Sequence, residues 1–151
     1  MLDLRQVPNV DSGTVASVVD SLPLPGVSKA ELGKLNLTVF PNIENEKWHN
    51  VTHIRASQNK FEVLPFVFRL QFLQELDLKN NKLKCLPNDV DCPNMTHFDV
   101  SANLLTNLPP AWVRNKSLQE IRFCYNKISN IDVFTDTNIS KELRIIDASN
   151  N

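Results

Sequence analysis

Side chains that could do acid-base or metal chemistry recur through the middle of the chain, at His53, Asp77, His97, Asp99 and Ser101. Imidazole, carboxylate and hydroxyl groups are what a hydrolase or a metal site requires. No glycine-rich phosphate loop and no known catalytic motif accompanies these residues. We therefore expect surface groups of a binding face, with no catalytic residue, no metal site and no cofactor in this stretch.

The composition narrows the class of protein further. The chain has 151 residues, of which 22% are charged and 42% are hydrophobic, and its net charge is −1. Without a basic stretch it lacks the electrostatic footprint of a nucleic-acid-binding protein. No apolar run approaches the roughly 20 residues of a membrane span. The first residues lack the basic and then apolar form of a secretory signal.

The elements that must position these side chains are internal repeats. Residues 73–87 spell L-x-x-L-x-L-x-x-N-x-L-x-x-L-P, and related spellings begin at residues 27, 51, 73, 95, 118 and 143. In the first repeat Leu35 occupies the asparagine position. Five copies place asparagine at the same phase: Asn59, Asn81, Asn103, Asn126 and Asn151.

This spelling resembles the leucine-rich-repeat family over roughly residues 27–151. The Leu-Pro that follows the asparagine is similar to the short-period class found in intracellular scaffolds and in Roco-type leucine-rich-repeat kinases. The resemblance implies an α/β solenoid of about six repeats, with a concave parallel β-sheet and short 3₁₀ or irregular convex segments. The sixth repeat is cut at Asn151, so we expect the repeats to belong to a longer protein.

The spelling has a physical explanation in such a coil. The alternation around Leu76 and Leu78 points two side chains inward from a short strand, and each repeat buries its apolar face against its neighbours. The asparagines lie where the chain leaves the strand, and their amides can pair backbone groups that the turn leaves free. Two inward columns are expected on the returning segments: Phe68, Val90 and Trp112, and Trp48, Leu70 and Cys92.

Residues 1–26 are less regular and form an N-terminal flank. Ser12 can cap a short helix that carries Val15, Val18, Val19 and Leu22 at helical spacing. The flank is interpreted as a degenerate cap over the first repeat, and an insertion between repeats of a longer array is the alternative. The segment of residues 129–142 is longer than the other returning segments and is polar, so we predict a bulging loop there.

The residues between the strand leucines face outward and supply the expected binding surface. Across repeats two to six they form columns of mostly charged and polar residues, in which Arg122 and Tyr125 are of types that dominate protein interfaces. The predicted partner is a protein whose identity the sequence does not reveal. The candidate partner-binding residues are His53, Arg55, Glu75, Asp77, Lys79, His97, Asp99, Glu120, Arg122 and Tyr125.

Two interpretations of the central acidic residues remain open. Asp77 and Asp99 should be lateral neighbours about 4.8 Å apart, and like charges at that distance repel unless they are partnered. Lys79 or a flanking arginine can pair with them inside the protein. Alternatively, Glu75, Asp77 and Asp99 form an acidic patch for a basic segment of the partner.

The compartment and wider context are also predictions with alternatives. The odd count of three cysteines argues against the disulfide caps of extracellular repeat domains and favours the cytoplasm. Five N-x-[ST] sequons, at Asn36, Asn50, Asn94, Asn115 and Asn138, favour a glycosylated receptor ectodomain instead. A further alternative is the regulatory or targeting region of a larger kinase or GTPase protein.

Overall fold

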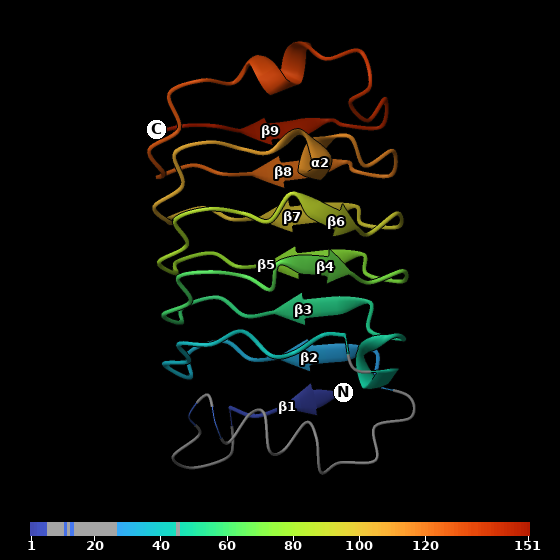
Figure 1. Ribbon diagram of the computed structural model, residues 1–151, viewed down its shortest axis with the longest axis vertical. Helices are drawn as coiled ribbons and strands as arrows, with labels where there is room; N and C mark the ends of the chain where they lie inside the picture. Colours follow the sequence, from blue (N-terminus) through green and yellow to red (C-terminus); the bar gives the residue numbers. More distant parts are fainter. Residues whose placement is uncertain (6–10, 12, 14–26, 45) are drawn as a thin grey trace.

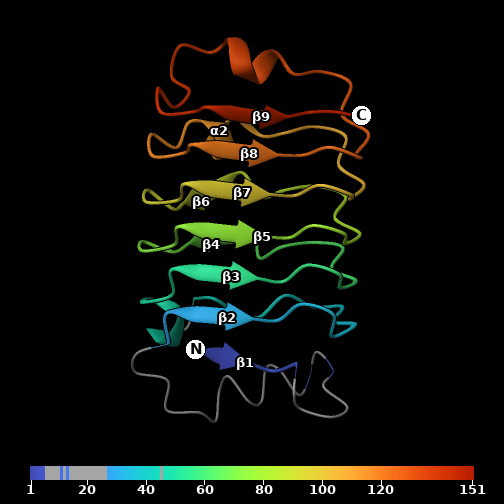
Figure 2. The same ribbon diagram turned by 180° about the vertical axis from the view of Figure 1, so that it is seen from behind.

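Short parallel strands stacked one above another dominate the computed structural model, which describes residues 1–5, 11, 13, 27–44 and 46–151. Each repeat contributes one strand to a seven-stranded sheet with the order β1-β2-β3-β5-β7-β8-β9. Figure 2 shows this sheet from its outer side, with all seven strands pointing the same way. The strands are β1 (Leu2–Asp3), β2 (Lys29–Glu31), β3 (His53–Arg55), β5 (Glu75–Asp77), β7 (His97–Asp99), β8 (Glu120–Arg122) and β9 (Ile145–Asp147).

The opposite side of the coil carries the returning segments (Figure 1). These are extended or contain single helical turns, because a repeat of 22–25 residues leaves no room for a long helix. The α/β solenoid predicted from the sequence is thereby confirmed. The elements on this side are the 3₁₀ helix η1 (Glu46–Trp48), strands β4 (Val67–Arg69) and β6 (Asp89–Asp91), helix α2 (Pro110–Val113) and the 3₁₀ helix η2 (Asp132–Thr135).

One feature on this side was not predicted. Strands β4 and β6 pair in parallel, with Val67 opposite Asp89 and Arg69 opposite Asp91, so two irregular segments form a second small sheet. In the next turn, Pro110 takes the first position of α2, where its missing N–H has no partner to lose. The Pro109-Pro110 pair therefore replaces a third strand with a helical turn.

The core lies between the two sides and follows the predicted alternation. The middle residue of each inner strand is buried, from Ala30 through Leu76 to Ile121. The two columns expected on the returning segments also point inward, with Phe68 and Trp112 fully buried and Val90 partly buried. Aromatic rings connect successive turns, and the Phe98 and Trp112 rings stack with centroids 4.6 Å apart.

The asparagine ladder runs along the edge where the strands end. Asn81 is 8% exposed; its Nδ2 donates to the carbonyls of Leu78 and Ala56, and its Oδ1 accepts from the amide of Phe61. Each amide thus pairs backbone groups of its own repeat and of the preceding one. The same arrangement holds at Asn59, Asn103, Asn126 and Asn151.

The residue before each ladder asparagine adopts the left-handed conformation, which the sequence did not reveal. Gln58, Asn80, Ala102, Tyr125 and Asn150 have φ between 53° and 57°. Such a conformation costs a non-glycine residue about 1 kcal/mol. In the first repeat, where Leu35 replaces asparagine, the residues on both sides of Leu35 are left-handed: Lys34 has φ 63° and Asn36 has φ 56°. The turn of this repeat is therefore atypical, as expected.

The sheet extends into the N-terminal flank. β1 pairs in parallel with β2, with Leu2 opposite Ala30, and both Leu2 and Leu4 are buried in the core. The short helix predicted over Val15 to Leu22 lies outside the described residues. The predicted loop at residues 129–142 contains η2, where Phe134 stacks on Phe123 at 5.7 Å.

All three cysteines are free thiols, and their surroundings predict different reactivity. Cys85 is exposed, whereas Cys92 is buried, and burial raises the pKa of the Cys92 thiol to about 12. A thiol of that pKa presents almost no thiolate near neutral pH. With a maleimide or disulfide reagent at pH 8, we expect Cys85 to react promptly and Cys92 to react only after unfolding. Mass spectrometry of peptides from the labelled protein checks this, and modification of both thiols at equal rates would contradict it.

Candidate functional site

The outer face of the seven-stranded sheet, here called the sheet face, brings the predicted surface columns together. Adjacent strands are in register, so His53, Glu75, His97 and Glu120 form one row. The central row of repeats two to six is Arg55, Asp77, Asp99, Arg122 and Asp147. The rows arise because alternate residues of a strand point to the same face.

The glutamates of this face are paired within the protein. The Arg55 guanidinium donates to the Glu75 carboxylate at 2.8 Å and to Glu31 at 3.2 Å. Arg122 pairs with Glu120 in the same way on the other side. Hydrogen bonding to Arg55 lowers the pKa of the Glu75 carboxyl. These glutamates therefore offer little free charge to a partner.

Glu31 is a residue of this network that the sequence analysis missed. It is 8% exposed, and it receives Arg55 at 3.2 Å and Arg5 at 3.9 Å. Its register opposite Arg55 places it in the central row. Extending the rows to the first repeat, where the middle of Lys29–Glu31 aligns with the other strands, would have found it.

The aspartates differ from the glutamates in their partners. Asp77 and Asp99 lie directly opposite each other in register, as predicted. One oxygen of each carboxylate accepts the backbone amide two residues on, from Lys79 and Ser101 respectively, at 2.9 Å. The Lys79 ammonium was one predicted partner, but its main chain supplies the contact. No cation lies within ion-pair distance of either aspartate in the part of the chain that the structure describes.

A shallow hollow of about 310 Å³ lies over these aspartates, between Glu75 and Arg122. Burial raises the pKa of the Asp77 carboxyl, and the neighbouring Asp99 charge raises it further. His97 lines the same hollow, with its Nδ1 held by the Thr96 hydroxyl at 2.8 Å. The hollow thus combines two carboxylates without cation partners and an imidazole edge, which suits a cationic side chain.

The remaining candidates lie at the margins of the hollow. His53 repeats the His97 arrangement with Thr52, and its Nε2 is 3.7 Å from Glu75. Tyr125 is 62% exposed in its left-handed turn, and Lys79 is exposed. They extend the sheet face toward the edge where the strands end.

The raised pKa of Asp77 predicts a pH-dependent stability. The native state holds the proton more tightly than the unfolded state, so the contribution of Asp77 is full at low pH and is lost as pH rises through its native pKa. Asp77→Asn keeps an oxygen to accept the Lys79 amide but cannot ionise. We expect this variant to be more stable than the parent at pH 7 and to lose that advantage near pH 3, as measured by urea unfolding.

Asp136→Asn provides a control of opposite sign. Hydrogen bonds from the Asn138 amide and from Arg114 lower the pKa of the Asp136 carboxyl. Its stabilisation is present above the unfolded pKa and is lost as pH falls through the native pKa. The Asn variant should be less stable than the parent at pH 7, and a loss of stability for Asp77→Asn at that pH would contradict the assignment.

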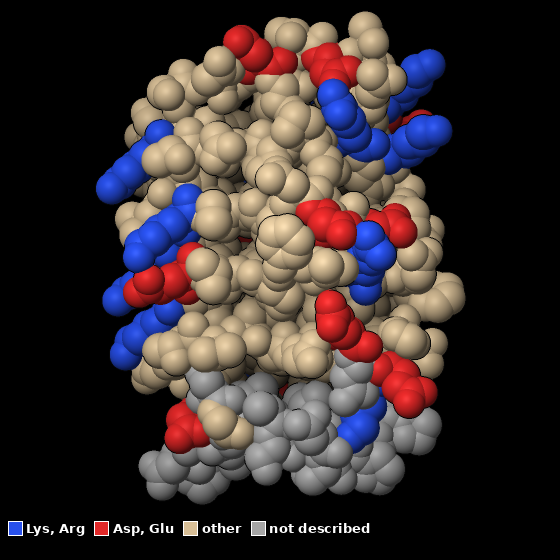
Figure 3. All heavy atoms as spheres, in the orientation of Figure 1, with Lys and Arg blue, Asp and Glu red and all other residues tan. Residues whose placement is uncertain are grey.

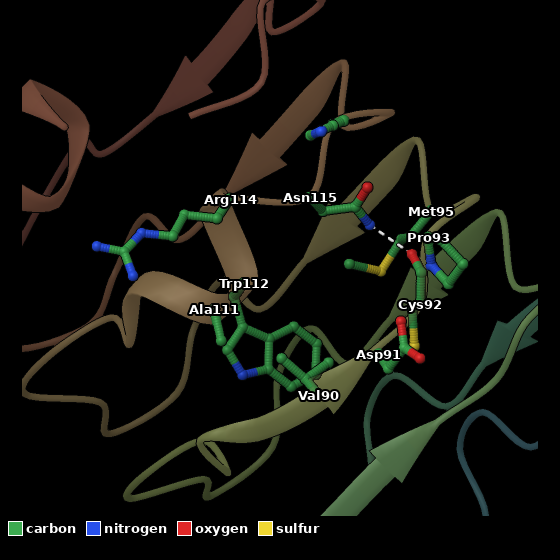
Figure 4. A pocket seen from close by; sticks show the side chains of 10 residues that line it. Val90, Asp91, Cys92, Pro93, Met95, Ala111, Trp112, Arg114 and Asn115 are labelled. Carbon is green, nitrogen blue, oxygen red and sulfur yellow. Dashed lines mark hydrogen bonds between the residues drawn. The ribbon is translucent and has the colours of Figure 1, made fainter. Parts of the chain in front are cut away.

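A second hollow, of about 440 Å³, lies on the opposite side between β6 and α2. Figure 4 shows Val90, Cys92 and Met95 around it, with the Asn115 amide donating to the Cys92 carbonyl. Its floor is apolar and its rim carries Arg114. Val90 and Cys92 belong to the predicted inward columns; Cys92 and Met95 are buried in the core, and Val90 is partly buried against it.

The sequons have a structural explanation in the stack. The Asn94 amide donates to the carbonyl of Gln71 at 2.7 Å, and the Thr96 hydroxyl donates to that of Gln74 at 3.1 Å. The hydroxyl of Thr52 bonds the preceding repeat in the same way, as does that of Ser140. Asparagine, threonine and serine side chains at these repeat positions therefore form hydrogen bonds between neighbouring repeats. This structural role accounts for some of the five sequons.

Two absences concern the described residues alone. Over residues 1–5, 11, 13, 27–44 and 46–151, no three His, Cys, Asp or Glu side chains gather closely enough to hold a metal ion. No helix within those ranges has the length and apolar character needed to cross a membrane.

Comparison with known proteins agrees with the geometry. The Leucine Rich Repeat family model matches residues 72–92, which span β5 and the return through β6. The volume-regulated anion channel subunit LRRC8D of Rattus norvegicus is 27% identical over 92 residues, or 58% of this chain. The aligned stretch spans 11% of that protein's length. The in-register strands and the buried asparagine ladder are those of a leucine-rich-repeat solenoid, and the matched family model lies within it.

Proposed function

We propose that this chain is a protein-protein interaction module that binds a basic segment of a partner protein on the sheet face. The observation that carries the proposal is the pair Asp77 and Asp99, adjacent in register and lacking cation partners among the described residues. The flanking arginines, Arg55 and Arg122, are engaged by glutamates. A guanidinium or ammonium of the partner would relieve the repulsion between the aspartates and would gain from their partial burial.

Charge reversal tests the proposal with a defined probe, an eight-residue peptide of alternating arginine and serine. Fluorescence anisotropy at an ionic strength of about 0.15 M, where the Debye length is about 8 Å, measures its binding. We expect Asp77→Lys with Asp99→Lys to weaken binding at least tenfold, because both attractive charges become repulsive. Asp77→Asn with Asp99→Asn should weaken it less, since the amide-accepting oxygens remain while the charge is removed.

A matched control separates local recognition from net charge. Asp132→Lys with Glu142→Lys changes the net charge by the same amount at exposed positions outside the sheet. This control should bind the peptide within about twofold of the parent, since exposed charges beyond a Debye length are screened. Equal weakening by both double variants, or unchanged binding by the sheet-face variant, would refute the proposal.

We further propose that the module works in the cytoplasm as part of a scaffold or signalling protein. The three free thiols and the Leu-Pro form of the repeats support this, and the inter-repeat bonds made by sequon residues weaken the argument for an ectodomain. Expression through a secretory pathway followed by glycosidase digestion tests the alternative. A mobility shift after digestion would favour an extracellular receptor domain.

A second candidate is the regulatory or targeting region of a larger protein, such as a kinase or a GTPase. The match to a much longer relative supports this class, because the aligned stretch covers only 11% of that protein. The full reading frame decides it, and a frame with no further domain would exclude it.

A further inference from the structure

Exposed apolar side chains gather at one place on the side opposite the sheet. Phe66 is 82% exposed and Val63 is 59% exposed, and both line a groove of about 400 Å³. Three consecutive turns build the groove, which also includes Cys85, Pro87 and Pro109. Exposed apolar groups that cluster around a recess mark interaction sites more often than scattered ones do.

A row of lysines follows the neighbouring edge of the coil. Lys60, Lys82 and Lys127 each come directly after a ladder asparagine, and their backbone amides bond the preceding repeat at 2.7–2.9 Å. They therefore occupy equivalent positions in their turns. Within the described ranges no carboxylate lies within ion-pair distance of these three, whereas Lys84 is paired with Glu62 at 2.7 Å. Figure 3 shows basic side chains along this edge beside an uncharged middle.

The lysine row and the groove are close enough to act together. Lys60 precedes Val63 by three residues, and Lys82 precedes Cys85 by three, in segments that contain no helix or turn. Three residues of extended chain span about 10 Å. A short segment lying across this side can therefore place one side chain in the groove and its neighbours beside the lysines.

We propose that the groove and the lysine row dock an acidic segment of a partner protein that carries one large apolar side chain. The apolar side chain enters the groove against Phe66, and the carboxylates face Lys60 and Lys82. The occupant follows from charge complementarity, since Lys60 and Lys82, which have no carboxylate within ion-pair distance among the described residues, precede the segments that form a groove lined by uncharged residues. This surface lies on the opposite side from the sheet face, so it goes beyond the function proposed above and can be occupied at the same time.

A protein segment suits this geometry better than an anionic bilayer. The groove is recessed between three turns, and its volume accommodates a single side chain. Basic side chains run along one edge of the coil (Figure 3), and no lysine is among the residues that line the groove. A planar membrane would need the cations and the apolar group to reach the same plane.

The test uses an eight-residue peptide of glutamates around one central phenylalanine, with anisotropy as the readout at an ionic strength of about 0.15 M, where the Debye length is about 8 Å. We expect Phe66→Ala to weaken binding at least tenfold, and Lys60→Glu with Lys82→Glu to do the same. Phe72→Ala and Lys116→Glu with Lys141→Glu are the matched controls, because these residues are exposed away from the groove. Both controls should stay within about twofold of the parent.

Several outcomes would overturn the proposal. These are no binding of the peptide, equal losses for Phe66→Ala and Phe72→Ala, or equal binding of a peptide whose phenylalanine is replaced by serine. A separate experiment measures binding of the protein to phosphatidylserine vesicles. Binding to them that depends on Phe66, without binding of the peptide, would assign the surface to a membrane and reject a protein segment. Circular dichroism spectra that match the parent show that the variants fold.

Discussion

Replacing Trp112 with alanine is expected to lower the free energy of unfolding by about 3–5 kcal/mol. The indole is fully buried, stacks on Phe98 at 4.6 Å and lies 5.6 Å from the ring of Phe68. Its Nε1 also donates to the carbonyl of Pro87 at 2.8 Å. Deleting it opens a cavity where two returning segments meet the sheet, so urea unfolding should shift to lower denaturant concentration.

The position of Trp112 also predicts how the protein unfolds. In a solenoid each repeat is stabilised mainly by its nearest neighbours. A cavity in the fourth repeat weakens the contact between the halves of the coil, so the unfolding transition should broaden. Circular dichroism and the fluorescence of the remaining tryptophan, Trp48, should therefore follow different transitions. Transitions that coincide would show that the two halves unfold together and would contradict this prediction.

Two further variants isolate the cause of the Trp112 effect. Trp112→Phe keeps an aromatic ring but loses the bond to Pro87, and it should cost about 1 kcal/mol plus part of the packing. Phe66→Ala removes a ring that is 82% exposed and should change stability by less than about 0.5 kcal/mol. Similar losses for Trp112→Ala and Phe66→Ala would show that burial does not decide the outcome.

Asn81→Leu is expected to have the second-largest effect, about 3 kcal/mol. Leucine has nearly the shape of asparagine but cannot pair the Phe61 amide or the carbonyls of Ala56 and Leu78. Each buried backbone group left without a partner costs about 1–3 kcal/mol. Equilibrium unfolding in urea measures the loss, and Asn103→Leu should reproduce it in the next repeat.

The neighbouring position supplies the control, and the structure determines which substitution is suitable. Asn80 has φ 56°, so a β-branched residue there would add strain unrelated to the ladder. Asn80→Gly fits this conformation and should change stability by less than about 0.5 kcal/mol. Equal melting temperatures for Asn81→Leu and Asn80→Gly would exclude the ladder as a source of stability.

The sheet face reconciles the two interpretations of its acidic residues. Internal pairing applies to Glu75, which Arg55 holds, whereas Asp77 and Asp99 have no cation within ion-pair distance among the described residues. Both aspartates also accept backbone amides at the ends of their strands. Their variants therefore affect stability as well as binding, which is why the asparagine forms accompany the charge reversals.

The repeat spelling determined the coil, the register of its strands and the inward positions. These features follow from local alternation and from a period that every repeat shares. Once one strand is placed, equivalent residues of the next must lie beside it, because only then do Leu76 and Phe98 stack in one core. The neighbours Asp77 and Asp99 and the buried Cys92 were predictable for the same reason.

Tertiary structure alone decided which charges remain available and which surfaces are hollow. Arg55 could have paired with an aspartate, yet its guanidinium reaches Glu75 and Glu31, a choice set by side-chain geometry across three strands. The left-handed turn at Asn80, the pairing of β4 with β6 and the groove beside Phe66 arise where separate turns meet. Periodicity specifies which residues are neighbours, whereas distances and rotamers between those neighbours determine the chemistry that they present.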